Sequence, residues 1–174
     1  MLKKINWRTT IRSAILAAIL FCIPVFFYIQ YDKYTGSWLL YLGSFLFLAV
    51  ICLHTIAESS RRKYNESTAI MVFESHVTTV IAIILCCFLS FLMLAIFVPG
   101  YLSPGVAEKT LTGEPVQVMV DKTNGLSYEI FMTATIVNFS VGSFSSIVFP
   151  FYTKRSQTGD KRRPPFSPKR SSIT

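Results

Sequence analysis

Long apolar stretches without a charged residue alternate along this chain with short segments that collect the charges. The charge-free stretches are residues 13–31, 34–57, 75–107 and 130–153. A helix rises about 1.5 Å per residue and the hydrocarbon core of a bilayer is about 30 Å thick, so about 20 apolar residues cross it. Each stretch reaches this length. The pattern therefore predicts an all-α integral membrane protein, a bundle of four antiparallel transmembrane helices.

The connections between these helices differ in length. We place the spans at about residues 12–31, 37–57, 76–98 and 129–152. The first two spans are joined by only a few residues, which predicts a tight helical hairpin. The third and fourth are joined by a long exterior loop that opens with helix-breaking Pro99 and Pro104. Within it, residues 116–120 alternate like a strand and residues 121–125 are turn formers, which favours a small β-hairpin.

Two ends of these elements have local signals. Asn65 or Ser67 is a suitable N-cap for the third helix, so we expect that helix to begin near Thr68, before the membrane itself. After Thr153 the chain is basic and rich in Pro and Ser, a composition that is too polar to fold. We therefore divide the chain into a membrane domain, residues 1–153, and a disordered cytoplasmic tail, residues 154–174.

The charges indicate how the chain is oriented. The net charge is +8, and 14 of the 17 basic residues lie on one side of the predicted membrane. These are Lys3, Lys4, Arg8 and Arg12 before the first span, Arg61, Arg62 and Lys63 after the second, and Lys154, Arg155, Lys161, Arg162, Arg163, Lys169 and Arg170 in the tail. The positive-inside rule then predicts that both termini lie in the cytoplasm. We expect the membrane to be the plasma (inner) membrane.

The basic excess also bears on partners. No folded nucleic-acid module fits into the segments that carry it, so we expect no nucleic-acid partner. The basic tail residues are instead expected to contact anionic lipid headgroups: Lys154, Arg155, Lys161, Arg162 and Arg163. The Pro-rich part of the tail, residues 162–168, also fits a polyproline ligand for an aromatic groove, which is the alternative interpretation.

Small and polar residues recur every four positions in the fourth span. Ala134, Asn138, Gly142 and Ser146 form one stripe, and small residues let helices approach closely in lipid. The stripe is expected to pack against the protein's own helices, or alternatively against a partner or a second copy. A shorter stripe, Ala14 and Ala18 in the first span, is the expected internal contact for it.

One group of side chains could support chemistry. His54 and Glu58 on the second helix and Glu74 and His76 on the third all fall at the cytoplasmic edge of the membrane. Two imidazoles and two carboxylates are a suitable ligand set for a transition metal, and the same groups could relay protons. Glu74 and His76 point in opposite directions on a helix, so at most one of them faces His54. The simpler interpretation is that all four are interfacial residues that pair with the neighbouring basic residues 61–63.

The span centres argue against an enzyme. None of them carries Asp, Glu, Lys or Arg, and no Ser, His and Asp set falls at one depth. We therefore expect no catalytic residue and no cofactor. The leading hypothesis is a non-enzymatic accessory or scaffold subunit of a membrane complex. The alternative is a small transporter or metal-binding membrane protein that uses the His/Glu group.

In the middle of the chain the second span runs into a basic stretch, residues 56–64, and the third span opens with an aromatic and polar segment, residues 73–76. A long exterior loop and a fourth span of small residues follow. In this arrangement the chain resembles a family of four-span inner-membrane proteins of unknown function from Bacteroidota-type bacteria. The resemblance implies a topology and no catalytic residue.

Overall fold

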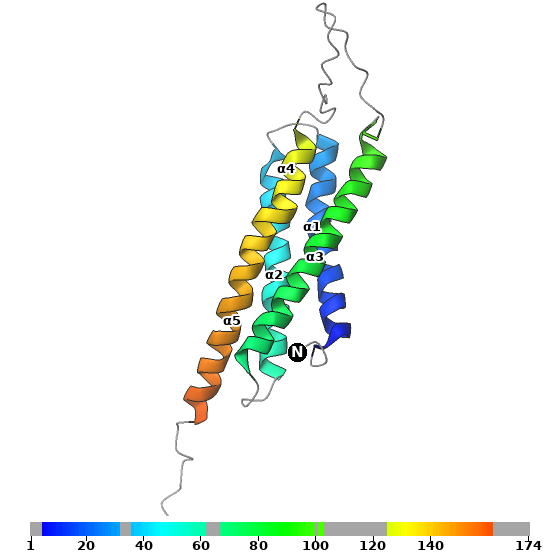
Figure 1. Ribbon diagram of the computed structural model, residues 1–174. Coiled ribbons are helices and arrows are strands. Elements are labelled where there is room, and N and C mark those ends of the chain that lie inside the picture. Colours follow the sequence, from blue (N-terminus) through cyan, green and yellow to red (C-terminus); the bar gives the residue numbers. More distant parts are fainter. Residues whose placement is uncertain (1–4, 32–35, 62–66, 100, 103–124, 162–174) are drawn as a thin grey trace, which may run out of the picture.

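The chain is built from long helices that lie side by side (Figure 1). The computed structural model describes residues 5–31, 36–61, 67–99, 101–102 and 125–161, and of Tyr31 and residues 156–161 the backbone alone. The elements are α1 (Trp7–Tyr31), α2 (Trp38–Arg61), α3 (Thr68–Phe97), α4 (Leu126–Met132), the π-helical turn η3 (Thr133–Val137) and α5 (Asn138–Lys161). The last three are consecutive and form one long helix. The described residues contain no strand.

Among the described residues, four helices are long and apolar enough to cross a membrane. The segments are Trp7–Gln30 and Trp38–Arg61, with 24 residues each, and Thr68–Phe97 and Leu126–Arg155, with 30 residues each. At about 1.5 Å per residue each exceeds the thickness of the hydrocarbon core. The prediction of an all-helical chain with four such helices is confirmed.

The helix ends agree with the sequence signals in one place and differ in another. Ser67 has an extended backbone and is the N-cap of α3, as predicted. The final helix continues to Lys161, although the polar composition after Thr153 predicted a disordered tail from residue 154. Lys, Arg and Gln are good helix formers and extend a helix that is already nucleated, whereas Pro164 and Pro165 cannot. The predicted hairpin, apart from Gly125, and residues 162–174 lie outside the described residues.

The packing order of the helices differs from the predicted one. α1 packs on α2 and α3, and α5 packs on the same two helices from the other side. The expectation that the Ala14 and Ala18 face meets α5 is therefore wrong: this face is buried against the nearer helices. Near the far end a side chain of α1 reaches across the bundle, where the Tyr28 hydroxyl donates a hydrogen bond to Glu129 Oε2 of α4.

The interior has two different halves. We call the end where α1 begins and α2 ends the basic end, because its described surface carries Arg8, Arg12, Arg61, Lys154 and Arg155; the opposite end is the far end. The buried side chains of the far half are mainly apolar, and they include Phe21, Val25, Phe47, Leu94 and Ile130. The buried side chains of the basic half are largely hydroxyls, with one imidazole and one carboxylate.

The buried stripe of the last helix explains its π-helical turn. Every fourth residue from Leu126 to Pro150 is buried. Because an α-helix has 3.6 residues per turn, a stripe with a period of four would rotate about 40° with each step. At the end of the turn η3 the Asn138 N–H donates to the Thr133 carbonyl, five residues earlier. This bond adds one residue to the turn and so rotates the stripe once in the opposite direction. The single π-helical turn therefore offsets part of the rotation that the stripe accumulates between Leu126 and Pro150.

Gly142 is the tightest point of this stripe. A Cβ added there would lie closer to Thr79 Cγ2 than real Cβ atoms approach. Thr79 is fully buried and β-branched, so its side chain has little freedom to move away. We predict that Gly142→Ala destabilises the protein by about 1–3 kcal/mol, since overpacking outweighs the better helix propensity of Ala. Unfolding of the purified protein in mixed micelles measures this.

The matched control removes the obstacle. In the double variant Gly142→Ala/Thr79→Ala both Thr79 side-chain atoms nearest the new methyl group are gone, so the two substitutions should destabilise less than the sum of their separate effects. Additive effects would show that α3 and α5 are not in contact at this point.

Candidate functional site

A buried histidine joins three helices in the basic half. The His54 side chain of α2 is 6% exposed and lies between two hydroxyl groups. Its Nδ1 is 3.0 Å from Ser13 Oγ of α1, and its Nε2 is 3.1 Å from Thr78 Oγ1 of α3. Both ring nitrogens are therefore used within the bundle.

The hydrogen bonds around His54 have a definite direction. The Thr78 hydroxyl donates its one proton to the Glu74 carbonyl, one turn earlier in α3, at 2.9 Å. Thr78 Oγ1 therefore accepts from His54 Nε2–H. In a neutral imidazole Nδ1 then carries no proton and accepts from the Ser13 hydroxyl. The bonds run head to tail from α1 through α2 into the backbone of α3.

A second group of hydrogen-bonded hydroxyls reaches the last helix, α5. Ser75 Oγ of α3 lies 2.9 Å from Ser146 Oγ of α5 and also contacts the hydroxyl of Thr55 of α2. Ser146 and Thr55 donate in their own helices, to the Gly142 and Ile51 carbonyls, each at 2.7 Å. The Ser75 hydroxyl therefore supplies the proton between these helices. Together, the two groups connect all four long helices.

The buried carboxylate holds the start of α1. Glu74 is 1% exposed, and its Oε1 accepts a hydrogen bond from the Asn6 N–H at 3.0 Å. Asn6 directly precedes the first residue of α1, where free N–H groups give the helix a partial positive charge. A carboxylate is favourable at this position. Glu74 therefore positions α1 against α3.

The predicted His/Glu ligand set does not assemble into a metal site in the described part of the chain. No group of three or more His, Cys, Asp and Glu side chains there could hold a metal ion. His54 bonds to hydroxyls, Glu74 to the start of α1, and the half-buried His76 places its Nδ1 3.0 Å from the carbonyl of Val72 in its own helix. Of the pair Glu74 and His76, the carboxylate is the one that faces the interior.

The predicted packing stripe is occupied by the chain's own helices. Ala134, Asn138, Gly142 and Ser146 are all buried. Asn138 is fully buried, and neither its Oδ1 nor its Nδ2 has a hydrogen-bond partner among the described residues. An amide without a partner costs several kcal/mol in a hydrocarbon-like interior, of the order of 2–7 kcal/mol. Asn138 directly follows the π-helical turn, and such turns are frequent at functional sites.

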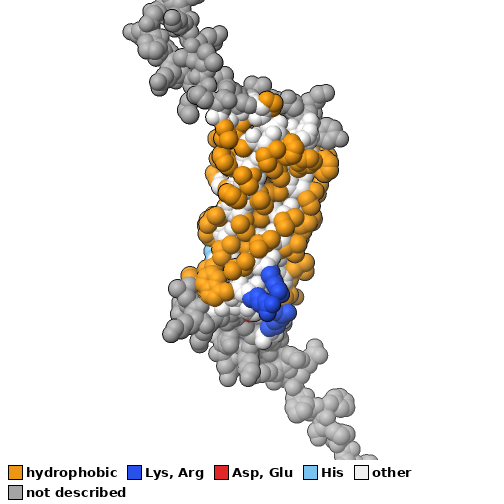
Figure 2. Space-filling model, turned by 90° about the vertical axis from the view of Figure 1, so that its right-hand side faces the viewer, with side chains coloured by type: hydrophobic (Ala, Val, Ile, Leu, Met, Phe, Trp, Pro, Cys, Tyr) orange, Lys and Arg blue, Asp and Glu red, His pale blue; other side chains and the backbone are white. Residues whose placement is uncertain are grey.

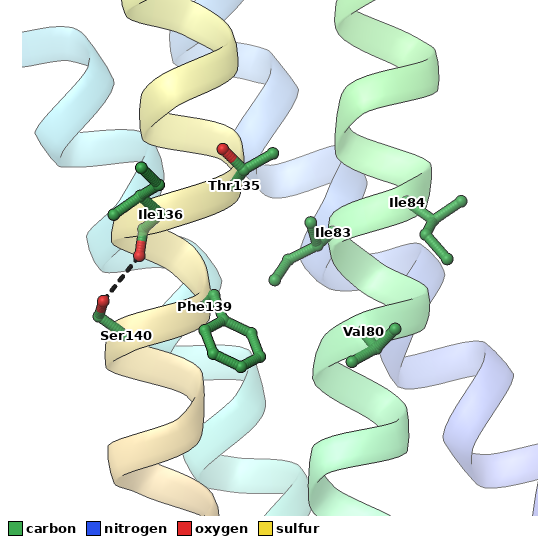
Figure 3. Close-up of a pocket in the computed structure, with 7 residues that line it drawn as sticks. All are labelled: Val80, Ile83, Ile84, Thr135, Ile136, Phe139 and Ser140. Carbon is green, nitrogen blue, oxygen red and sulfur yellow. Dashed lines mark hydrogen bonds between the residues drawn. The ribbon is translucent and has the colours of Figure 1, made fainter.

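A groove lies between α3 and the last helix, on the side away from the polar interior (Figure 3). It has a volume of about 430 Å³ and is lined by Val80, Ile83 and Ile84 of α3 and by Thr135, Ile136, Phe139 and Ser140. The two hydroxyls bond within their own helix, Ser140 to the Ile136 carbonyl at 2.8 Å and Thr135 to the Phe131 carbonyl at 2.6 Å. The groove therefore offers an apolar surface.

On the described surface, charged and apolar side chains lie in separate regions. In Figure 2 a broad apolar band covers most of the described face, and basic side chains gather at one end of it. Arg8, Arg12 and Arg61 are exposed there, as is Arg155. This suits contact with anionic headgroups. Of the predicted tail contacts, Arg162 and Arg163 lie outside the described residues, and so does the side chain of Lys161.

Several residues of the interior network were not singled out from the sequence. They are Ser13, Thr55, Ser75 and Thr78. The available signal is the spacing of Ser75, Thr78 and Thr79, because hydroxyls three and four residues apart share one helix face. A face of hydroxyls inside a charge-free span predicts a side turned away from lipid.

Comparison with known proteins gives no relative. The chain matches no protein-family model, no curated protein and no solved structure. The resemblance of residues 56–64 and 73–76 to four-span inner-membrane proteins therefore stays a prediction.

The histidine bonds predict a specific pattern of stability effects. His54→Phe keeps much of the ring volume but removes both bonds, so we expect a loss of about 1–3 kcal/mol. Combining it with Ser13→Ala should recover part of this loss, because the half-buried Ser13 hydroxyl is then no longer left without the imidazole, whereas Thr78 keeps its bond to the Glu74 carbonyl. Unfolding in mixed micelles, monitored by circular dichroism, gives the free energies of unfolding of the unchanged protein, of His54→Phe and of the combined variant.

His76→Phe is the matched control, since His76 is only half-buried and bonds within its own helix. It should change the free energy of unfolding by less than about 0.5 kcal/mol. Equal effects at the two histidines would contradict a role of His54 in joining the helices.

Proposed function

We propose that this protein is a non-enzymatic accessory or scaffold subunit of a membrane complex. The observation that carries the proposal is that several polar side chains of the basic half form hydrogen bonds between helices. His54, Glu74 and the hydroxyls of Ser75 and Ser146 all have partners inside the chain. Their hydrogen-bonding capacity thus goes into holding four helices together. What remains for a partner is the surface.

The proposed setting is the plasma (inner) membrane, with the helices antiparallel in the bilayer and both termini in the cytoplasm. The supporting observation is the bias of charge, since 14 of 17 basic residues flank one side of the spans. The apolar band above the basic end in Figure 2 fits the same arrangement. The alternative, a transporter or metal-binding protein, has no comparable support in the described residues.

The orientation predicts how single cysteines react. After replacement of the four native cysteines by Ala, Thr123→Cys should react with a membrane-impermeant maleimide on intact cells, and Ser171→Cys only after the membrane is opened. These positions lie in the loop between the third and fourth spans and in the tail, on opposite sides of the proposed topology. The reverse labelling pattern would overturn the orientation.

The subunit role predicts a defined assembly. When the tagged protein is extracted in a mild detergent and weighed by native mass spectrometry, we expect a heteromeric particle of fixed stoichiometry. A co-purifying protein counts as a subunit only if its copy number is constant and a tag on it recovers this chain. His54→Asn, which retains a polar side chain, should leave that stoichiometry unchanged once the variant is folded.

A monomer or homo-oligomer under every mild condition would contradict the subunit role. In that case a transport or metal assay that is lost in His54→Asn but retained in His76→Asn would favour the alternative function.

A further inference from the structure

Asn138 and Ser44 are buried polar side chains that have no hydrogen-bond partner among the described residues. Asn138 directly follows the π-helical turn in the last helix, and Ser44 belongs to α2. Their exposed fractions are 0% and 6%, so both face the interior of the bundle. The amide offers two donor protons and an acceptor oxygen, and the hydroxyl offers one donor proton and an acceptor oxygen. These hydrogen-bonding groups are not used by any described residue.

The two side chains lie at nearly the same depth on neighbouring helices. α2 and α5 pack on each other, and both run from the far end toward the basic end (Figure 1). Cys52 Sγ lies 3.2 Å from Ser145 Oγ, which aligns the two helices at that level. Asn138 is seven residues before Ser145, about 10 Å nearer the far end. Ser44 is eight residues before Cys52, about 12 Å nearer the far end.

Small residues surround the amide on its other sides. Gly142 contacts Thr79 of α3, which runs antiparallel to α5. Four residues nearer the far end, Asn138 is therefore level with residue 83 of α3 and next to the fully buried Ala82. Ala134, one turn away in its own helix, is also fully buried. The methyl groups of Ala82 and Ala134 are short and form no hydrogen bond, so Ser44 is the polar side chain opposite the amide.

We propose that a buried water molecule binds between Asn138 and Ser44 and joins α5 to α2 near the middle of the last span. The two side chains select this ligand. A hydrocarbon group would leave the amide unpaired, and a cation would lose its hydration between two groups that carry no charge. A water molecule donates to one of the side chains and accepts from the other, and together they provide the polar partners that a buried water needs.

The backbone explains why water joins these groups in place of a direct bond. The Asn138 N–H donates to the Thr133 carbonyl in the π-helical turn, and one turn later Gly142 is fixed against Thr79. The amide is thus held in position from both sides along the helix. A water molecule bridges polar groups that are too far apart to bond directly, and its immobilisation costs less than an unpaired buried amide.

Magnetisation transfer from water to the Asn138 amide tests the proposal directly. The chain has four asparagines, so a protein that is isotope-labelled at asparagine nitrogen alone gives four side-chain amide signals. Asn138→Ala identifies the signal of interest by its loss. In the full chain in detergent micelles, we expect a nuclear Overhauser cross-peak between water and this amide, with opposite signs in the laboratory and rotating frames. Those signs show a contact with bound water, whereas proton exchange gives the same sign in both.

Two substitutions of Ser44 distinguish bound water from the serine hydroxyl. A hydroxyl that exchanges with solvent passes magnetisation to a neighbouring amide, and Ser44→Ala removes that route. A water held by the amide remains, so the cross-peak should persist in Ser44→Ala. In Ser44→Leu the larger side chain takes the place of the water, and the cross-peak should disappear.

Unfolding in mixed micelles gives a second readout that does not need Ser44→Leu to fold. Asn138→Ala and Ser44→Ala each remove a partner of the same water, so their effects on the unfolding equilibrium constant should be non-additive by at least about twofold. Ser90→Ala is the matched control. Ser90 of α3 is also fully buried, but it lies seven residues, about 10 Å, beyond the level of Asn138. Its effect should add to that of Asn138→Ala.

Three outcomes would overturn the proposal. Without a water cross-peak at the Asn138 amide of the unchanged protein, the amide is dry. A cross-peak that is lost in Ser44→Ala comes from the hydroxyl, and the two side chains then contact each other directly. Additive effects of Asn138→Ala and Ser44→Ala show that no water joins the two residues. None of these measurements depends on the subunit role, which the heteromeric mass decides.

Discussion

The structure depends on one constraint: a polar group inside a membrane bundle must find its partner within the protein, because hydrocarbon offers none. In the basic half this constraint connects the helices. The His54 ring uses one nitrogen toward α1 and the other toward α3, and Ser146 adds α5 through Ser75. Hydrogen bonds between membrane helices contribute little singly, about 0.6 kcal/mol on average, but they require a definite geometry. The network therefore fixes which helix faces meet more than it adds stability.

The far half is packed mainly through apolar side chains. Its core is aromatic and aliphatic, and α1 and α2 approach closely because Gly43 leaves room for Phe21. The bond from Tyr28 to Glu129 crosses this apolar core between α1 and α4, helices that otherwise have few contacts. Tyr28 is fully buried, so its hydroxyl would be costly without that acceptor. This hydrogen bond therefore links α1 to α4 at the far end, where the two helices have few other contacts.

The sequence predicts the elements well because hydropathy acts locally. A charge-free run of span length needs no knowledge of its neighbours, and the N-cap at Ser67 is equally local. The order of packing was not predictable in this way. Ala14 and Ala18 are small enough to pack against any helix, so their size could not distinguish α5 from α2 and α3. The extension of α5 to Lys161 likewise depends on a helix nucleated far upstream, not on the composition of the tail.

The site was only half predictable for a related reason. His54 and Glu74 stand out because ionisable residues are rare in spans, but their partners are common residues such as Ser13 and Thr78, and only the packing selects them. Asn138 lies outside this network: its amide is buried at the end of the π-helical turn without a bond to any described residue. The stripe that carries it must stay in register with α2 and α3, as the contact of Gly142 with Thr79 requires. Helix packing has therefore determined the position of this amide against the preference of its own hydrogen-bonding groups. At the π-helical turn, a small change in helix rotation would therefore change the surroundings of a buried amide that has no hydrogen-bond partner among the described residues.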